Sequence, residues 1–438
     1  MGKLIILALI LLIGVTTNAQ TWSAVGAGMN YSVYALTVYN NNLYAGGDFD
    51  SAGGNSANNI AEWNGTSWTD VGTGMDVYVM ALTVYNGNLI AGGAFASAGG
   101  KPANEIAEWN GISWDSLGAG MNESGVVTDL TVYNGKLYAG GSFFIAGGKP
   151  AIYIAEWNGT SWDSVGVTGT YTGGPWNVAA LAVYNGNLYA GGEFTGMGGK
   201  PANSIAEWNG TSWDSVGAGM NNNSSVLALA VYNGNLYAGG YFTTAGGNPA
   251  SYIAEWNGTS WSAVGGGTNG SVDALIVYNG NLYAGGGFDS AGGNPASYIA
   301  EWNGTSWSAL GSGTNGSVNA LIVYNGNLYA GGRFTTAGGN PANSIAEWND
   351  GTGINQINSN VNNELLYPNP LTSSSTLQLD TQLKNAEVVI YNMVGKEIMS
   401  KKLTGDRMEI ERGALESGVY LVSIKDGEKQ WIKKMMVE

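Results

Sequence analysis

The segment Ile106-Ala107-Glu108-Trp109-Asn110-Gly111-Ile112-Ser113-Trp114-Asp115-Ser116-Leu117-Gly118 recurs along this 438-residue chain with small changes. Its opening tetrapeptide, Ile-Ala-Glu-Trp, occurs seven times at spacings of 46 to 51 residues, ending at Trp63, Trp109, Trp157, Trp208, Trp256, Trp302 and Trp348. Self-similarity at a fixed period of this length is the signature of a repeat architecture. The main part of the chain is therefore built from seven copies of one unit.

Each unit contains four short runs of apolar, β-branched and aromatic residues, separated by turn residues. In the second copy these runs are residues 81–85, 88–93, 106–109 and 113–118. Between them stand Asn-Gly dipeptides, which tolerate the positive φ angles of a tight hairpin. The apolar spacing of three and four that marks a helix is absent. Each unit is predicted to be a four-stranded antiparallel blade, and the fold class is predicted to be all-β.

The two ends of the array predict how the repeats close. A motif of tryptophan, two residues, valine or leucine, and glycine also occurs seven times, and its first copy, at Trp22, precedes any complete unit. After Trp348 the chain reads Asn349-Asp350-Gly351-Thr352, without such a motif. The segment Thr21 to Gly26 is therefore expected to complete the last blade, which removes an exposed sheet edge. The prediction is a seven-bladed β-propeller over residues 20–350, closed by its N-terminal strand.

A double glycine follows the second strand of every unit, an aromatic residue ends the third strand, and a tryptophan opens the fourth. In these features the array resembles a kelch-type β-propeller over about 330 residues, although the Glu-Trp pair departs from that pattern. The resemblance implies the fold. It does not imply one activity, because this architecture hosts enzymes, adaptors and lectins.

The first nineteen residues are predicted to be a secretory signal peptide. Lys3 precedes an apolar run from Leu4 to Val15, and the small residue Ala19 marks the expected cleavage site. Twelve helical residues rise only about 18 Å, too little for roughly 30 Å of hydrocarbon. We therefore expect an exported chain that loses this segment.

Composition excludes several chemistries. The chain has no cysteine and no histidine, and its 16 basic and 32 acidic residues give a net charge of -16. A Ser-His-Asp relay, a zinc site with cysteine or histidine ligands, and a copper site of the kelch-like oxidase kind are thereby ruled out. The acidic balance disfavours nucleic acid as a partner. We predict no metal, no cofactor and a monomer.

Residues that recur in every blade have two possible interpretations. Fourteen of the 16 tryptophans occupy the two repeated strand positions. We favour packing between blades over a ring of sugar-stacking platforms, since each tryptophan can bury about 200 Å². The seven glutamates of the Ile-Ala-Glu-Trp motif are likewise interpreted as structural hydrogen-bond acceptors rather than as catalytic acids.

Binding residues are expected where the blades differ. The turns with Asn-Gly lie on one face of the propeller. The connections from second to third strand, and from outer strand to next blade, lie on the other, which we call the variable face. Just after each double glycine the residue differs between blades, and the candidates there are Asp48, Glu193, Tyr241 and Arg333. The longest inter-blade loop, 167–177, adds Tyr171 and Trp176. Aromatic residues near amides and carboxylates suit a glycan. A neutral insertion, whose tryptophan only packs, is the alternative for this loop.

The C-terminal part differs in composition. Residues 21–350 hold 5 basic and 21 acidic residues, whereas residues 351–438 hold 10 and 11. We predict a linker at 351–363 and, from period-2 alternation, a small β-sandwich at 364–438.

Four ordered segments of this tail resemble the type A C-terminal sorting domain of the type IX secretion system. They are Tyr367-Pro368-Asn369-Pro370, Val389 to Glu397 with Gly395, the segment from Gly418 through Tyr420 to Val422, and a basic-apolar ending. A fibronectin-like module is the alternative. The resemblance implies recognition by the type IX machinery of a Bacteroidota cell, followed by release or attachment to the outer-membrane surface.

Together these features predict an exported cell-surface or secreted, non-catalytic binding protein whose variable face binds a glycan or a protein. The alternatives are an extracellular hydrolase or lyase that uses carboxylates such as Asp48, Glu193 or Asp129, and a structural adhesin.

Overall fold

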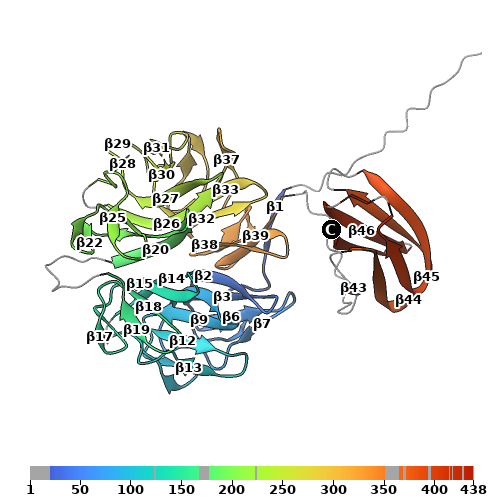
Figure 1. The fold of residues 1–438 in the computed structure, drawn as a ribbon, viewed down its shortest axis with the longest axis horizontal. Coiled ribbons are helices and arrows are strands. Elements are labelled where there is room, and N and C mark those ends of the chain that lie inside the picture. Colours follow the sequence, from blue (N-terminus) through green and yellow to red (C-terminus); the bar gives the residue numbers. More distant parts are fainter. Residues whose placement is uncertain are drawn as a thin grey trace, which may run out of the picture. The chain divides into compact units, whose positions relative to one another are not determined.

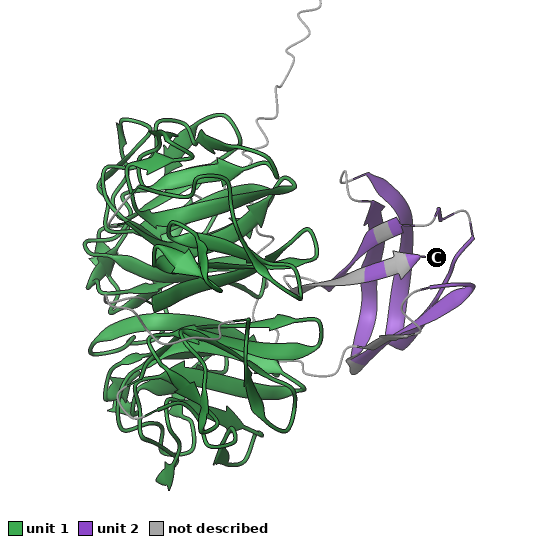
Figure 2. Ribbon diagram, turned by 60° about the vertical axis from the view of Figure 1, so that its left-hand side comes forward, with its two compact units in different colours: residues 1–351 green, residues 352–438 purple. Residues whose placement is uncertain are grey.

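The computed structural model describes residues 20–122, 125–166, 177–221, 224–350, 365–367, 371–392, 396–413, 415–416, 418–426 and 429–437. The chain divides into two compact units, Met1–Gly351 and Thr352–Glu438 (Figure 2). The regular structure of the described residues is β-strand throughout. No helix among these residues is long and apolar enough to cross a membrane. The all-β prediction is confirmed.

Seven four-stranded antiparallel sheets make up the described part of the first unit (Figure 1). We number these blades from 1 to 7 in chain order and name their strands from the inside outward. Blades 1 to 4 are β2 (Ser32–Tyr39), β3 (Asn42–Asp48), β6 (Ile60–Trp63), β7 (Trp68–Asp70); β8 (Val79–Tyr85), β9 (Asn88–Gly93), β12 (Ile106–Trp109), β13 (Trp114–Ser116); β14 (Val127–Tyr133), β15 (Lys136–Gly141), β18 (Ile154–Trp157), β19 (Trp162–Ser164); and β20 (Asn177–Tyr184), β21 (Asn187–Glu193), β24 (Ile205–Trp208), β25 (Trp213–Ser215). Blades 5 to 7 are β26 (Ser225–Tyr232), β27 (Asn235–Tyr241), β30 (Ile253–Trp256), β31 (Trp261–Ala263); β32 (Val272–Tyr278), β33 (Asn281–Gly286), β36 (Ile299–Trp302), β37 (Trp307–Ala309); and β38 (Val318–Tyr324), β39 (Asn327–Gly332), β42 (Ile345–Asn349), β1 (Thr21–Ala24).

Blade 7 takes its outer strand from the opposite end of the sequence. Strand β1 pairs with β42 in antiparallel register, with Trp22 opposite Trp348 and Ala24 opposite Ala346. In Figure 1 the blue β1 accordingly lies beside the orange strands of this blade. The predicted closure of the ring by the N-terminal strand is confirmed.

Between the second and third strands of each blade lies a two-stranded hairpin on the variable face. These hairpins are β4 (Ser51–Ala52) with β5 (Asn55–Ser56), β10 (Ser97–Ala98) with β11 (Lys101–Pro102), β16 (Ile145–Ala146) with β17 (Lys149–Pro150), β22 (Gly196–Met197) with β23 (Lys200–Pro201), β28 (Thr244–Ala245) with β29 (Asn248–Pro249), β34 (Ser290–Ala291) with β35 (Asn294–Pro295), and β40 (Thr336–Ala337) with β41 (Asn340–Pro341). They give each blade an individual surface above a shared framework.

Tryptophans hold neighbouring blades together. In each blade the indole Nε1 of the outer-strand tryptophan donates a hydrogen bond of 2.7–3.0 Å to a backbone carbonyl of the preceding blade. The same ring lies 5.2–5.4 Å from the tryptophan that ends the third strand. All fourteen are buried. The packing interpretation of the repeated tryptophans is confirmed.

The double glycines let adjacent blades approach closely. A Cβ on Gly285 would lie 2.5 Å from Cγ1 of Val318 in the next blade, and a Cβ on Gly286 would lie 2.0 Å from the carbonyl oxygen of Ser271. The first glycines of the other blades face the corresponding valines at 2.4–2.6 Å. Any side chain at the first position would therefore force two blades apart.

The seam between blades 3 and 4 carries an additional polar staple. Asp129 stands where the other blades have alanine, and its two carboxylate oxygens accept the backbone N–H of Leu130 at 2.8 Å and of Leu181, in blade 4, at 2.6 Å. Beside it the Thr128 hydroxyl donates to the carbonyl of Val178 at 2.6 Å. Removal from solvent raises the pKa of the Asp129 carboxyl from its ordinary 3.8 to about 7, against the opposing effect of the two N–H donors.

The second unit is a small β domain, as predicted. Its strands are β43 (Leu365–Tyr367), β44 (Ser374–Asn392), β45 (Glu397–Glu411), β46 (Gly418–Asp426) and β47 (Lys429–Val437). The long strand β44 pairs with β43 near its start, with β46 near its end and with β45 along most of its length. Leucine, valine and isoleucine side chains from these strands form its core.

Replacing Trp22 by alanine is expected to lower the free energy of unfolding of the propeller by about 3–5 kcal/mol, because a buried indole and its hydrogen bond to Leu310 are lost. Urea unfolding followed by tryptophan fluorescence measures it. Trp213→Ala, in the middle of the array, should cost a similar amount. The exposed Ile112→Thr should change stability by less than about 0.5 kcal/mol. A Trp22→Ala variant as stable as Ile112→Thr would show that β1 does not close the ring.

Gly285→Ala should destabilise by about 1–3 kcal/mol, since the new methyl group would overlap Val318. Combining it with Val318→Ala should cost less than the sum of the two single changes, because the second removes the overlapping atoms. Urea denaturation of the four proteins measures this coupling, and strict additivity would contradict the steric explanation.

Asp129→Ala is expected to alter the pH dependence of stability. Because the folded-state pKa is raised from 3.8 to about 7, the native protein holds a proton that the unfolded chain has lost within this window. Stability of the parent protein relative to the variant should therefore fall as pH rises from about 4 to 7 and level off above it. Because the Asp129 side chain is only half-buried, the expected change in the free energy of unfolding is on the order of 1 kcal/mol. A pH-independent difference in urea midpoints would refute the assignment.

Candidate functional site

The candidate residues that follow the double glycines come from four different blades. Asp48, Glu193 and Tyr241 end the second strands of blades 1, 4 and 5, and Arg333 follows the second strand of blade 7. All four side chains are exposed, and Tyr241 reaches 61% exposure. Tyr171 and Trp176 fall outside the residues that the structure describes. The role of these six residues as a binding site stays a prediction.

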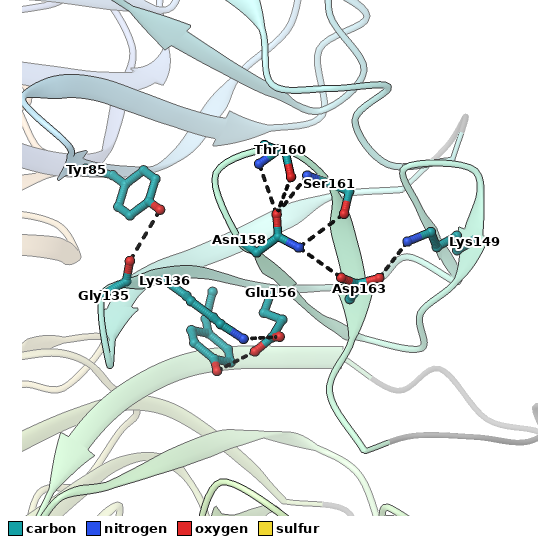
Figure 3. Close-up of polar contacts among 10 residues, drawn as sticks. Tyr85, Gly135, Lys136, Lys149, Glu156, Asn158, Thr160, Ser161 and Asp163 are labelled. Atoms are coloured by element: carbon teal, nitrogen blue, oxygen red, sulfur yellow. Dashed lines mark hydrogen bonds and ion pairs between the residues drawn. The ribbon is translucent and has the colours of Figure 1, made fainter.

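The repeated glutamates are structural acceptors. Glu62, Glu207, Glu255, Glu301 and Glu347 each accept a hydrogen bond from the side-chain amide of an asparagine on the second strand of their own blade. In blade 3, Glu156 instead accepts from Lys136 and from Tyr138, both at 2.6 Å (Figure 3). Burial, together with this carboxylate, raises the pKa of Tyr138. For these six blades the structural interpretation is confirmed.

A cleft of about 480 Å³ opens on the variable face between blades 1 and 2. We call it the blade 1–2 cleft. Its aromatic lining is Tyr31, Phe49 and Tyr78, and Tyr31 is 63% exposed. Its polar lining is Asp48, Asp50, Asn58, Asn59 and Asp76, with Met75 and Val77 completing the wall. Of the sequence-predicted residues, Asp48 belongs to this cleft.

The carboxylates of the cleft are held in place by the backbone and by amides. Oδ1 of Asp76 accepts the N–H groups of Ala96 and Ser97 at 3.0 and 2.9 Å. These bonds join the loop between blades 1 and 2 to the hairpin of blade 2. Asparagine makes the same pair of bonds at the corresponding positions of blades 1, 3, 5, 6 and 7. Oδ1 of Asp50 accepts from Asn30 at 2.7 Å.

Lysines do not neutralise the cleft. The four lysines in the described part of the propeller pair with carboxylates elsewhere: Lys101 with Asp115, Lys136 with Glu156, Lys149 with Asp163, and Lys200 with Asp214. Figure 3 shows two of these pairs in blade 3. The blade 1–2 cleft therefore presents negative charge and hydrogen-bond acceptors to solvent.

A second cavity, of about 240 Å³, lies on the propeller axis and is lined by the innermost strands of all seven blades. We call it the axial pocket. Each of these strands has a register shift near its start; in blade 1 Val33 pairs with Gly47 and Ala35 with Gly46, so that Tyr34 is an extra residue. Such a bulge redirects a side chain. The seven bulge residues, which all line the pocket, are Tyr34, Met80, Thr128, Ala179, Leu227, Asp273 and Asn319.

Sequence reasoning missed this ring of bulge residues. Its signal is nevertheless present, because the position varies in every copy between an invariant valine and, in six copies, an alanine. In blade 1 this reads Val33-Tyr34-Ala35, and in blade 6 Val272-Asp273-Ala274. Burial raises the pKa of Asp273, against the effect of a hydrogen bond with Ser271.

An aromatic residue of the axial pocket contacts an aromatic residue of the cleft. The rings of Tyr34, in the axial pocket, and Tyr78, in the cleft, lie 6.3 Å apart at 81°, an edge-to-face arrangement.

Within the described residues, no group of three or more acidic side chains is arranged to hold a metal ion.

The predicted sorting motif is only partly described. Tyr367 ends β43, Gly418 begins β46, and Tyr420 is buried with its hydroxyl donating to the carbonyl of Glu416 at 3.0 Å. Pro368, Asn369, Pro370 and Gly395, like Ala19 and the linker 351–363, lie outside the described residues.

Comparison with solved structures shows the fold. The extracellular domain of the hybrid two-component system BT3049 from B. thetaiotaomicron aligns with a TM-score of 0.53 at 12% identity, over 95% of this chain and 57% of that chain. PorZ, a bacterial surface component of the type IX secretion system of Porphyromonas gingivalis, aligns with a TM-score of 0.45 at 16% identity, over 93% and 59%. This chain spans less than three fifths of either protein. A search of curated proteins found no match. The kelch assignment stays a prediction.

Residues 365–438 match the family model of the secretion system C-terminal sorting domain. The match covers the β domain of β43 to β47 and the segments on which the sequence resemblance rests. Such a domain implies an interaction with the type IX secretion machinery. The chain thus carries a type IX C-terminal sorting domain, which follows an all-β propeller in the sequence. The protein is secreted or attached to the outer-membrane surface.

Proposed function

We propose that this protein is a non-catalytic binding protein that presents its propeller outside the cell and binds a glycan on the variable face. The observation that carries the proposal is the blade 1–2 cleft, where exposed Tyr31 and half-buried Tyr78 stand beside the carboxylates of Asp48, Asp50 and Asp76. Export by the sorting domain supplies the location.

The chemistry of the cleft supports a carbohydrate ligand. Carboxylates and asparagine amides accept and donate hydrogen bonds to hydroxyl groups, and the face of a tyrosine ring packs against the C–H groups of a sugar. The uncompensated acidic residues disfavour uronic acids and sulfated sugars, because like charges repel. We therefore propose a neutral or amino-sugar glycan.

The hydrogen bonds that already hold the carboxylates favour binding over catalysis. Six of the seven repeated glutamates accept hydrogen bonds from asparagine or lysine, and both oxygens of Asp129 accept backbone N–H groups, so these carboxylates are occupied by the fold. In the cleft, Asp50 and Asp76 are also fixed through one oxygen each. Their outward oxygens are placed as hydrogen-bond acceptors for a ligand.

Binding of the full-length exported protein to a glycan array, followed by calorimetric titration of the best ligand, tests the proposal. Tyr31→Ala and Asp76→Asn should each weaken binding about tenfold or more, since each removes one direct contact. Asp76→Asn should leave the fold intact, because asparagine makes the same two backbone bonds in blade 1 and four other blades.

Phe144→Ala is the matched control, because Phe144 is an exposed aromatic residue beside the blade 3 hairpin and lines neither cavity. The affinity of this variant should stay within about twofold of the parent protein. If no glycan binds, or if Phe144→Ala weakens binding more than Tyr31→Ala does, the proposed site is wrong.

A further inference from the structure

The axial pocket is built from the positions at which the blades differ most. Its bulge residues alternate with framework positions that are nearly invariant, so that one variable side chain per blade points into a common space of about 240 Å³. The bulge leaves this residue out of the ladder, which separates its side chain from the packing of the blade. Where the bulge residue makes no hydrogen bond to the neighbouring blade, a substitution changes the pocket without changing the framework.

The ring of bulge residues contains one continuous polar arc. Asp273, Asn319 and Tyr34 come from blades 6, 7 and 1, which are neighbours because the ring is closed. Of the other four bulge residues, Met80, Ala179 and Leu227 are apolar, and Thr128 donates its hydroxyl to the carbonyl of Val178. A sugar ring has a matching division between hydroxyl-bearing edge and C–H face, so the pocket is complementary to it.

Some polar groups of the pocket serve the framework. The Thr128 hydroxyl donates to Val178, both Asp129 oxygens accept N–H groups, and the Asn319 amide donates to the carbonyl of Val33 at 3.2 Å. Asp273 differs from these, because its carboxylate makes a hydrogen bond with Ser271, in its own blade. Its carboxylate is therefore the pocket's best-placed acceptor for a ligand.

The pocket is too small for an oligomer but adjoins a larger site. Its volume is below the roughly 300–1,000 Å³ of sites that enclose a drug-sized ligand. The blade 1–2 cleft has about twice this volume, and its Tyr78 contacts Tyr34 of the pocket. A ligand that occupied both would place one terminal unit in the pocket and further units along the cleft.

We propose that the axial pocket receives the terminal sugar of the glycan, and that Asp273 and Asn319 determine which sugar is accepted. This inference rests on the proposed function. It changes the kind of recognition from binding anywhere along a polysaccharide to binding at a chain end.

The experiment compares linear oligosaccharides with cyclic ones of the same sugar, such as linear maltoheptaose with cyclomaltoheptaose, and extends to linear xylan, mannan and chitin oligomers. Calorimetric titration of the full-length protein should show at least tenfold tighter binding of a linear ligand, because a cyclic one has no end to insert. Asp273→Ala and Asn319→Ala should each lower affinity for that ligand about tenfold and reduce discrimination between terminal sugars.

Alanine is tolerated at this position, since Ala179 occupies it in blade 4, so Asp273→Ala should keep the melting temperature of the parent protein. Asn319→Ala also loses the hydrogen bond to Val33, so its melting temperature is measured together with its affinity. Phe144→Ala, which lines neither cavity, is the control and should leave affinity within about twofold of the parent protein. Binding that is equal for linear and cyclic ligands, or unchanged in Asp273→Ala while Tyr31→Ala abolishes it, would overturn the axial inference and leave the cleft proposal standing. Failure of all glycans to bind would overturn both.

Discussion

The antiparallel ladder between β1 and β42 joins residues more than 300 positions apart in sequence. The packing of every other pair of neighbouring blades into a closed ring depends on it. Without β1, blade 7 would expose the edge of β42, and Trp348 would lose the ring of Trp22. Closure also makes blades 6, 7 and 1 neighbours, which is what brings Asp273, Asn319 and Tyr34 to one arc of the axial pocket. The variable face therefore exists as a single surface only because the ring is shut.

Much of this architecture could be predicted from the sequence because its periodicity is unusually strict. The two-residue turns fix the strand register by themselves, since the tight hairpin at Asn40-Asn41 pairs Tyr39 with Asn42 and the pairing of both strands follows from there. Counting in this way would pair Tyr34 with Gly47, yet the structure pairs Val33 with Gly47. One inserted residue in each inner strand, which no propensity signals, directs seven side chains into the axial pocket. The axial pocket was missed for that reason, whereas Asp48 ends the regular strand β3 and its role in binding stays a prediction.

The blades assign stability and recognition to different residues. Indole hydrogen bonds, glycine contacts and glutamate–asparagine pairs recur with nearly the same geometry around the ring, so these positions are fixed by packing. The residues after the double glycines and the bulge residues vary between blades, although Thr128 and Asn319 also bond to a carbonyl of the neighbouring blade. Asp129 likewise combines the two roles, since a residue at a framework position lines the pocket while it staples blades 3 and 4.

Seven copies in one chain also serve as their own comparison. In blades 2, 3 and 4 a hairpin lysine pairs with an outer-strand aspartate, as Lys149 does with Asp163. In blades 5, 6 and 7 asparagine replaces the lysine and serine replaces the aspartate, so that the two positions change together. Such a paired change is expected of two residues in contact, because a charge at one position alone would have no opposite charge beside it. Positions that vary without a partner on the same blade are not explained by the framework. Tyr34 and Leu227 vary in this way, and both line the axial pocket.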